Sequence, residues 1–362
     1  MTTAPAPGAS PADRDVTGQQ AVHHVRVSGS DEVFDVPVGQ RIHAAARRAG
    51  IWFPFECGWG SCGSCKATVV EGRTELLFPG APAVEPRDER RRRVVLCQST
   101  PCGDLVIRPR WVDHQPPPER PLRDYLGRLV DVEPLGPAIA RFRFELTDND
   151  GSPLVADYRP GQFAILETEP GLRRCLSLAG LPGGNRVEFI AKHYPNGPGS
   201  GRLFALSPGE IIPIELPYGD MWLRETENPV VLVAGGTGIS AILAMVRDLA
   251  ERSAGGPRVH VVYGATTREE LVCWDELRLL TDAIANARLH GALLKPDESW
   301  TGQTGLVTDA LEAVLAGYSG EPGAGNPVEV YLAGPPPMVR AVEELLARYA
   351  VLRDRVHVDS FG

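Results

Sequence analysis

The sequence lacks any apolar run near the roughly 20 residues that a membrane span needs. Its formal net charge at pH 7 is −9, which argues against nucleic acid as a partner, because phosphate binding needs clustered positive charge. Its start also lacks the apolar core of a secretory signal, and we expect residues 1–21 to be a disordered segment rich in Ala, Pro and Thr. These absences indicate a cytoplasmic protein with no membrane and no nucleic-acid partner.

Cysteine is scarce and unevenly placed. Of the 7 cysteines, four form one pattern: Cys57, Cys62 and Cys65 in one stretch, and Cys97 further on. Clustered cysteines in a large chain without a signal are typical of metal binding in a reducing compartment, not of a disulfide framework. The other three are expected to be small, buried apolar residues: Cys102, Cys175 and Cys273.

The spacing of these cysteines narrows the choice of metal. Four residues separate Cys57 from Cys62 and two separate Cys62 from Cys65, which is the plant-type [2Fe–2S] spacing. The glycines in this loop allow tight turns and let backbone N–H groups approach the sulfurs. A structural zinc site also uses four cysteines, but zinc sites usually pair two closely spaced motifs, and Cys97 stands alone. The pattern therefore favours a [2Fe–2S] cluster.

The pattern of apolar, proline and glycine residues changes twice along the chain. These changes predict a multidomain protein. Residues 22–112 hold short β-type runs and one helical stretch, 41–49, and the proline-rich segment 113–121 predicts a linker. Strand-like runs between Pro and Gly turns in 122–223 are typical of an antiparallel β-barrel. In 224–362 apolar strands alternate with helices, which predicts a doubly wound α/β sheet with ligands at the carboxyl ends of its strands.

The last of these blocks contains a candidate nucleotide loop. The apolar strand Val230–Ala234 leads into Gly235, Gly236, Thr237 and Gly238. A strand, a glycine turn and a helix start suit a pyrophosphate, since glycines permit close approach and a helix N-terminus carries partial positive charge. The loop is not a GxGxxG fingerprint, and taken alone a plain strand-to-helix turn explains it equally well. Further strands are expected at Val259–Tyr263 and Val328–Ala333, and helices at Ala241–Arg252, Glu269–Leu280, Thr308–Leu315 and Met338–Tyr349.

Taken together, the cysteine loop, the later Val95–Gln98 and the two following blocks resemble the NADH-dependent reductase components of bacterial multicomponent oxygenases. Leu77–Pro82 and Val356–Phe361 resemble the branch that serves toluene and related soluble di-iron monooxygenases. The similarity runs from about residue 22 to the last residue. It implies a β-grasp [2Fe–2S] ferredoxin domain, a flavin barrel and a nicotinamide domain, in that order.

The resemblance also assigns a flavin site. Arg174–Ser177 is similar to the Arg-x-Tyr-Ser signature of the ferredoxin-reductase superfamily, which places Arg174 at the FAD pyrophosphate and Ser177 beside flavin N5, the atom that receives hydride. Cys175 and Leu176 lie between them, and Leu176 stands where the family usually has tyrosine. Leucine can pack on the isoalloxazine but cannot hydrogen-bond the ribityl chain.

A second phosphate loop follows from the same resemblance. Gly199 and Ser200 occupy its place, where backbone N–H groups and a hydroxyl can serve the diphosphate. Taken alone, this stretch is an ordinary turn.

For the nicotinamide, Val330–Met338 resembles the family's Cys-Gly-Pro-Pro motif, with Gly334 and Pro335 kept and Ala333 in place of the cysteine. Phe361 matches the C-terminal aromatic residue that covers the flavin in relatives and moves aside for nicotinamide. Both an arginine, which suits a 2′-phosphate, and carboxylates, which suit a free 2′-hydroxyl, occur in 266–270. The resemblance favours NADH over NADPH.

The resemblance therefore implies electron flow from NADH through FAD and a [2Fe–2S] cluster to an oxygenase or hydroxylase component, either directly or through a small ferredoxin or coupling protein. A soluble di-iron monooxygenase is the leading acceptor, and a Rieske-type oxygenase or a cytochrome P450 is the alternative. A third hypothesis, a non-catalytic zinc-bearing interaction module, takes its support from Leu176 and Ala333. The arginine-rich run 87–93 is either ordinary solvated surface or a docking patch for an acidic partner.

Overall fold

The computed structural model describes residues 21–114, 120–252, 256–318 and 325–360. Nearly all of the predicted disordered segment and Phe361 lie outside these ranges. The chain divides into two compact units, the first formed by 1–124, 165–175 and 212–215 and the second by 125–164, 176–211 and 216–362. Among the described residues, no helix combines the length and the apolar character needed to cross a membrane.

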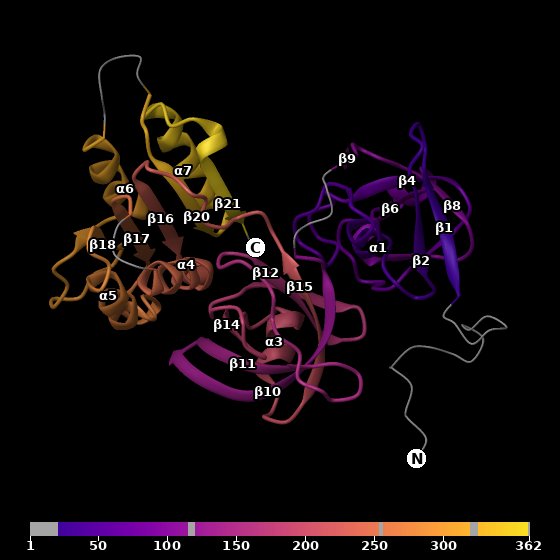
Figure 1. Cartoon of the computed structure of the whole chain (residues 1–362), viewed down its shortest axis with the longest axis horizontal. Coiled ribbons are helices and arrows are strands. Elements are labelled where there is room, and N and C mark those ends of the chain that lie inside the picture. The colour runs from indigo at the N-terminus through magenta and orange to yellow at the C-terminus, as the bar shows by residue number, and fades with distance from the viewer. Residues whose placement is uncertain (1–20, 115–119, 253–255, 319–324, 361–362) are drawn as a thin grey trace. The chain divides into compact units, whose positions relative to one another are not determined.

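The first unit is built on a five-stranded sheet in the order β2-β1-β8-β4-β6 (Figure 1). Its strands are β1 (Val22–Val27), β2 (Val33–Pro37), β4 (Lys66–Glu71), β6 (Arg93–Val95) and β8 (Leu105–Pro109). Strands β1 and β8 are parallel, whereas β1–β2, β4–β6 and β4–β8 are antiparallel. Helix α1 (Ile42–Arg48) shares one apolar core with this sheet, because alternate strand residues face the helix. This arrangement confirms the predicted α+β ferredoxin fold.

Shorter elements complete the unit: β3 (Ile51–Trp52), β5 (Thr74–Leu76), α2 (Pro86–Arg90), β7 (Ser99–Pro101) and β9 (Asp113–His114). Strand β9 pairs with β3, so the first two residues of the predicted linker belong to a sheet. Backbone pairing there was missed because the prolines that suggested a linker come only after His114. Residues 115–119 lie outside the described part of the chain.

The predicted barrel region forms a six-stranded sheet in the order β13-β12-β15-β10-β11-β14. Its elements are β10 (Arg123–Gly136), β11 (Ile139–Thr147), β12 (Phe163–Glu169), β13 (Leu172–Ser177), β14 (Arg186–Lys192), α3 (Pro198–Phe204) and β15 (Ile211–Tyr218). Strands β12, β13 and β15 each contribute residues to both units. Helix α3 occupies the stretch in which the sequence suggested only a loop or turn.

The nicotinamide region is a parallel sheet in the order β19-β18-β17-β16-β20-β21 (Figure 1). Its strands are β16 (Val230–Gly235), β17 (Val259–Ala265), β18 (Ala287–Leu293), β19 (Gln303–Thr304), β20 (Glu329–Gly334) and β21 (Val356–Ser360), and its helices are α4 (Ile239–Glu251), α5 (Trp274–Asp282), α6 (Val307–Ala316) and α7 (Pro336–Arg348). Leu232 and Ala234 face a core shared with α4 and α5, whereas Val231 and Val233 face one shared with α6 and α7. The predicted doubly wound fold is therefore confirmed.

One expectation in this region was wrong, and two strands were not predicted. The helix expected over Glu269–Leu280 is interrupted, because Cys273 has φ = 59° and α5 begins only at Trp274. Strands β18 and β21 were missed because polar residues such as His290 and Asp359 break their apolar pattern.

Candidate redox cofactor sites

The four cysteines of the predicted cluster come together in the first unit as two pairs of thiols. The Sγ atoms of Cys65 and Cys97 lie 3.2 Å apart and are buried. Cys57 forms the second pair, since the Cys62 thiol hydrogen-bonds to it and lowers its pKa to about 4. Cys57 is half-buried and Cys62 is exposed.

Backbone donors surround the outer pair. The N–H groups of Ser61 and Cys62 donate to Cys57 Sγ at 3.3 and 3.4 Å, and the Ser64 N–H donates to Cys62 Sγ at 3.4 Å. Such donors stabilise negative charge on sulfur, which is the form that binds metal. The loop is therefore shaped for thiolates.

This arrangement fits a two-iron cluster better than a single zinc ion. A [2Fe–2S] cluster takes four thiolates, two for each iron. Two thiol pairs, Cys57 with Cys62 and Cys65 with Cys97, meet that requirement.

The loop is also closely packed within its unit. Gly58 has φ = +67°, and a Cβ there would lie 2.9 Å from Cys175 Sγ. The Cys175 thiol in turn donates to the Cys57 carbonyl at 3.0 Å. Of the cysteines outside the pattern, Cys175 and Cys273 are half-buried and Cys102 is exposed, so the expectation of three buried residues was wrong. Cys102 lies at the surface because it belongs to the turn between β7 and β8.

Strand β13 carries the predicted flavin residues. The Arg174 guanidinium lies 4.3 Å from the centre of the Trp59 ring, and burial lowers its pKa. At the end of the strand, the buried Ser177 hydroxyl donates to Asp359 Oδ2 at 2.7 Å. Burial raises the pKa of Asp359 to about 6, although this hydrogen bond opposes the rise. Leu176, between them, is half-buried.

The predicted second phosphate loop opens α3. Gly199 is buried, and the Ser200 hydroxyl accepts from the Tyr194 N–H at 3.0 Å and donates to the Tyr194 and Gly197 carbonyls. The Ser200 hydroxyl is therefore already hydrogen-bonded within its own loop. Backbone N–H groups are then the donors that this stretch can offer a diphosphate.

The two predicted nucleotide-binding motifs lie in the loops at the carboxyl ends of β16 and β20. The strand order of the sheet reverses between these two strands. Ligands of doubly wound sheets bind at such a point. Gly236 has φ = +54° with open space where a Cβ would be, so the loop is left clear for a pyrophosphate. The Tyr263 hydroxyl donates to the Gly236 carbonyl at 3.3 Å. Thr237 is half-buried beside it.

Neighbouring glycines serve close packing. A Cβ at Gly235 would collide with Met338, and one at Gly238 would collide with the Ala333 carbonyl. Gly334 ends β20, and Pro335 stands directly before α7. The structure thus brings together the two nucleotide motifs that the sequence placed about 100 residues apart.

Comparisons with known proteins agree with this geometry. Residues 25–102 match the 2Fe-2S iron-sulfur cluster binding domain, and residues 232–344 match the oxidoreductase NAD-binding domain. The chain is 37% identical over 335 residues to the ferredoxin–NAD(+) reductase component of the alkene monooxygenase system of Xanthobacter autotrophicus, covering 89% of this chain and 95% of that relative. It is 30% identical to the reductase component of phenol 2-monooxygenase from a Pseudomonas species, covering 94% of each chain.

The chain belongs to the reductase components of bacterial multicomponent oxygenases. A solved ferredoxin reductase in carbazole 1,9a-dioxygenase agrees in fold, with a TM-score of 0.80 at 27% identity, over 94% of this chain and 99% of that one. The protein is thus an iron–sulfur flavoprotein oxidoreductase that uses [2Fe–2S], FAD and a nicotinamide. The predicted family and cofactor set are confirmed, and the zinc-module hypothesis is not supported.

Two residues of the reductase's candidate sites were missed by the sequence interpretation. Asp359 had a usable signal, since it stands two residues before the predicted Phe361. Trp59 had one too, because it lies inside the cysteine loop. The sequence does not show that Asp359 contacts Ser177 or that Trp59 contacts Arg174, because the two partners of each contact lie more than 100 residues apart.

Proposed function

We propose that this reductase passes electrons from NADH, through FAD and its [2Fe–2S] cluster, to the oxygenase component of a soluble di-iron monooxygenase in the cytoplasm. The observation that carries the proposal is the pairing of four thiols around backbone N–H donors, in one chain with a nucleotide loop at a sheet reversal. Relatives named as alkene, phenol and propane monooxygenase reductases support the choice of acceptor.

A bound FAD would supply the exchange between two-electron hydride chemistry and one-electron transfer. The chain's own residues position these groups. Arg174 supplies a guanidinium for the FAD diphosphate, since a planar fork of donors matches phosphate oxygens. Ser177 presents its hydroxyl at the end of β13. The hydroxyl donates a hydrogen bond to Asp359, which fixes the orientation of the hydroxyl. We assign Phe361, outside the described residues, to cover the flavin.

The preference for NADH rests on the loop that follows β17. Glu270 is paired with Lys192 at 2.7 Å, and the Arg268 guanidinium stacks 5.2 Å from the centre of the Trp300 ring. Glu269 is exposed. A carboxylate in this place suits a free ribose 2′-hydroxyl and repels a 2′-phosphate, so Glu269 is the residue that we assign to cofactor choice.

An anaerobic titration tests the proposal. NADH added to the iron-loaded, flavin-loaded reductase should bleach the flavin absorption and then produce the EPR signal of a reduced [2Fe–2S] cluster, and NADPH should do so more slowly. Bleaching of the flavin without any cluster signal in iron-replete protein would show that the electron route is wrong.

A second acceptor class has support from solved structures. The carbazole dioxygenase reductase at 27% identity serves, by its name, a dioxygenase. We therefore keep a Rieske-type oxygenase, the alternative that the sequence resemblance implied, as the rival acceptor. Purified oxygenase components of both classes, given this reductase and NADH, separate the two. Faster product formation with the di-iron component supports the proposal, and faster formation with the Rieske component replaces it.

A further inference from the structure

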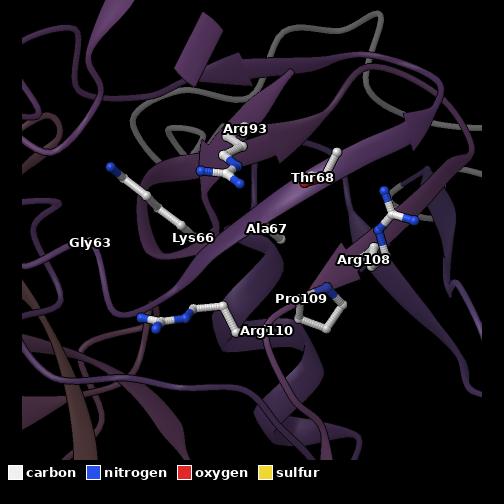
Figure 2. Close-up of a pocket in the computed structure, with 8 residues that line it drawn as sticks. All are labelled: Gly63, Lys66, Ala67, Thr68, Arg93, Arg108, Pro109 and Arg110. Atoms are coloured by element: carbon white, nitrogen blue, oxygen red, sulfur yellow. The ribbon is translucent and has the colours of Figure 1, made fainter. Parts of the chain in front are cut away.

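One face of the first unit's sheet gathers four cations around a hollow. The hollow has a volume of about 430 Å³ and lies over β4, β6 and β8 (Figure 2). Lys66, Arg93, Arg108 and Arg110 line it, with Thr68 between them. We call these four cations the cation groove.

Strand register explains why these side chains share a face. Thr68 lies directly opposite Arg93 on β6 and opposite Arg108 on β8. Residues opposite each other in a sheet point to the same side, and so do residues two apart along a strand. Lys66 therefore joins that side, whereas Ala67, between Lys66 and Thr68, is buried in the core. Arg110 directly follows β8 and also lines the hollow. The short Thr68 side chain in the middle leaves the hollow open.

The positive charge of the groove is only partly balanced. The carboxylate of Asp88 is almost fully buried and lies 2.8 Å from Lys66 Nζ and 4.0 Å from Arg93. Arg108 and Arg110 are exposed, and within the described part of the chain neither has an ion pair or a side-chain hydrogen bond. Like charges across neighbouring strands destabilise a sheet. In a chain of net charge −9, this local excess of cations indicates a site for an anionic ligand.

The groove adjoins the cysteine loop. Gly63, which also lines the hollow, follows Cys62, and Lys66 follows Cys65. Cys62 is the exposed member of the four cluster cysteines. An acceptor that takes electrons from the cluster must approach this loop closely, so the groove borders the exposed part of the electron donor.

The arginine-rich run does not form this surface by itself. Arg87 is paired with Glu85 at 2.8 Å, and Arg92 donates to the backbone carbonyls of Val70 and Gly72. Of the residues in 87–93, only Arg93 lines the hollow. The cation groove is therefore a different surface, formed by residues that the sheet brings together, and docking by the run 87–93 stays a prediction.

We propose that the cation groove docks an acidic face of the protein that accepts electrons from the cluster. The inference rests on the proposed function for the existence of such an acceptor. Four cations, on β4, β6 and β8 and just after β8, match several carboxylates on a protein surface rather than one small anion. The net charge of −9 disfavours a nucleic acid, which would be repelled by the rest of the chain.

Charge reversal at the two unpaired arginines tests the proposal. The double variant Arg108→Glu/Arg110→Glu is compared with the intact reductase, using cytochrome b5, an acidic haem protein, as the acceptor. At low ionic strength we expect about tenfold slower NADH-dependent reduction of cytochrome b5, because steering by opposite charges is lost. Reduction of cytochrome c, a basic haem protein, should not slow. Arg108→Gln/Arg110→Gln should give an intermediate loss.

The matched control is Arg90→Glu/Arg91→Glu, which changes the charge equally on exposed positions of the same unit and should stay within about twofold of the intact reductase. Binding is followed separately by fluorescence anisotropy of a labelled oligo-glutamate peptide, which should bind the intact protein more tightly than the Arg108→Glu/Arg110→Glu variant.

Three results overturn the proposal: an unchanged cytochrome b5 rate in an iron-replete Arg108→Glu/Arg110→Glu variant, an equal loss in the Arg90→Glu/Arg91→Glu control, or tighter binding of inorganic phosphate or a DNA oligonucleotide than of the peptide. Failure of the proposed function looks different. In that case NADH would not reduce the cluster of the intact reductase, while peptide binding would still report on the groove.

Discussion

At the scale of single residues, Asp359 is the most unusual group in the reductase. It is a half-buried carboxylate whose one described hydrogen bond comes from Ser177. Burial disfavours the charged form of an acid, and the pKa of Asp359 rises from 3.8 to about 6. The folded protein therefore holds this proton more tightly than the unfolded chain does.

This difference predicts a pH-dependent stability effect of Asp359→Asn. Below pH 3.8 both states bind the proton and the carboxyl costs nothing. As the pH rises towards 6, the unfolded chain loses the proton first, so wild-type stability falls, and above pH 6 the full cost of at most about 3 kcal/mol is present. Asparagine carries no charge and can still accept from Ser177. We expect Asp359→Asn to raise the unfolding midpoint at pH 7.5 and to raise it about half as much at pH 5.

Thermal unfolding at the two pH values measures this effect. Ser177→Ala provides the control, because it removes the hydrogen bond and leaves the carboxylate, and should lower the midpoint at pH 7.5. A gain from Asp359→Asn that is the same at both pH values would contradict the assignment.

At this scale the sequence singled out four cysteines that the structure brings together in two pairs, since their spacing is local and the chemistry of thiolates is specific. Their role as cluster ligands stays a prediction. It did not predict the contacts of Asp359, Trp59 or Asp88. Each of these contacts depends on a partner that the fold brings from elsewhere in the chain, and no local pattern records it.

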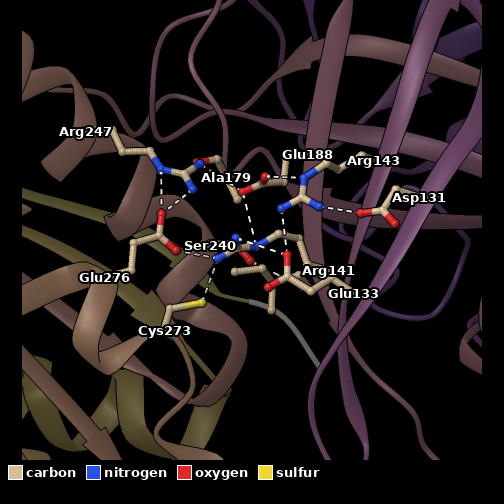
Figure 3. A network of polar contacts seen from close by, with 11 residues as sticks. Asp131, Glu133, Arg141, Arg143, Ala179, Glu188, Ser240, Arg247, Cys273 and Glu276 are labelled. Atoms are coloured by element: carbon tan, nitrogen blue, oxygen red, sulfur yellow. Dashed lines mark hydrogen bonds and ion pairs between the residues drawn. The ribbon is translucent and has the colours of Figure 1, made fainter.

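At the scale of elements, a polar network joins strands β11 and β14 to helices α4 and α5 within the second unit (Figure 3). Arg141 is 8% exposed and bonds Glu276 Oε2 at 2.6 Å and Cys273 Sγ at 3.1 Å. Arg247 contacts the same Glu276 and also Glu188, at 2.8 Å. Two arginines thus share two carboxylates between the sheet strands and the helices.

Because Arg141 is nearly buried, its removal should be costly. Arg141→Met removes one of the arginines that Glu188 and Glu276 share and leaves Arg247 as their remaining partner, a loss of about 3 kcal/mol. We expect the unfolding midpoint of the second unit to fall by about 10 °C. The control is Arg128→Met, because the Arg128 side chain is 51% exposed and pairs with Glu145; this variant should cost under about 1 kcal/mol. Similar midpoints for the two variants in calorimetry would show that the network is not stabilising.

Several helices and strands followed from the pattern of apolar residues, such as the uninterrupted apolar run Val230–Ala234 and the helical run Ala241–Arg252. Departures occurred where a single residue overrode the pattern. The left-handed backbone of Cys273 interrupted one expected helix, which begins only after it, and the polar side chains of β18 and β21 hid two strands. Strands at or next to the edge of a sheet keep polar residues, and a search for apolar patterns assigns such stretches to loops.

At the scale of the whole molecule, changes of composition along the chain predicted three blocks, but compact packing gives two units. Composition reports what is contiguous in sequence, whereas 165–175 and 212–215 join the first unit from far along the chain. The predicted boundaries at 112, 121 and 223 stay predictions.

This division predicts where iron removal will be felt. Metal binding stabilises the folded site that holds it, so chelation under reducing conditions should speed amide hydrogen exchange in 22–112 and also in 165–175 and 212–215. Strands β16 and β17 should stay protected, because their core lies in the second unit. Mass spectrometry of peptic peptides measures this, with iron-reconstituted protein as the control. Faster exchange confined to 22–112, or spread evenly over the chain, would contradict the division.

The first unit combines segments from distant parts of the chain, and this limits how domains can be exchanged between such reductases. Within it, the Gln98 amide donates to the Gly171 carbonyl at 3.1 Å, and Arg41 pairs with Glu167 at 2.8 Å. A chimera spliced at the proline-rich segment would take each donor from one parent and each acceptor from the other. Exchanging ferredoxin modules between homologues therefore calls for carrying residues 165–175 along with the transplanted piece.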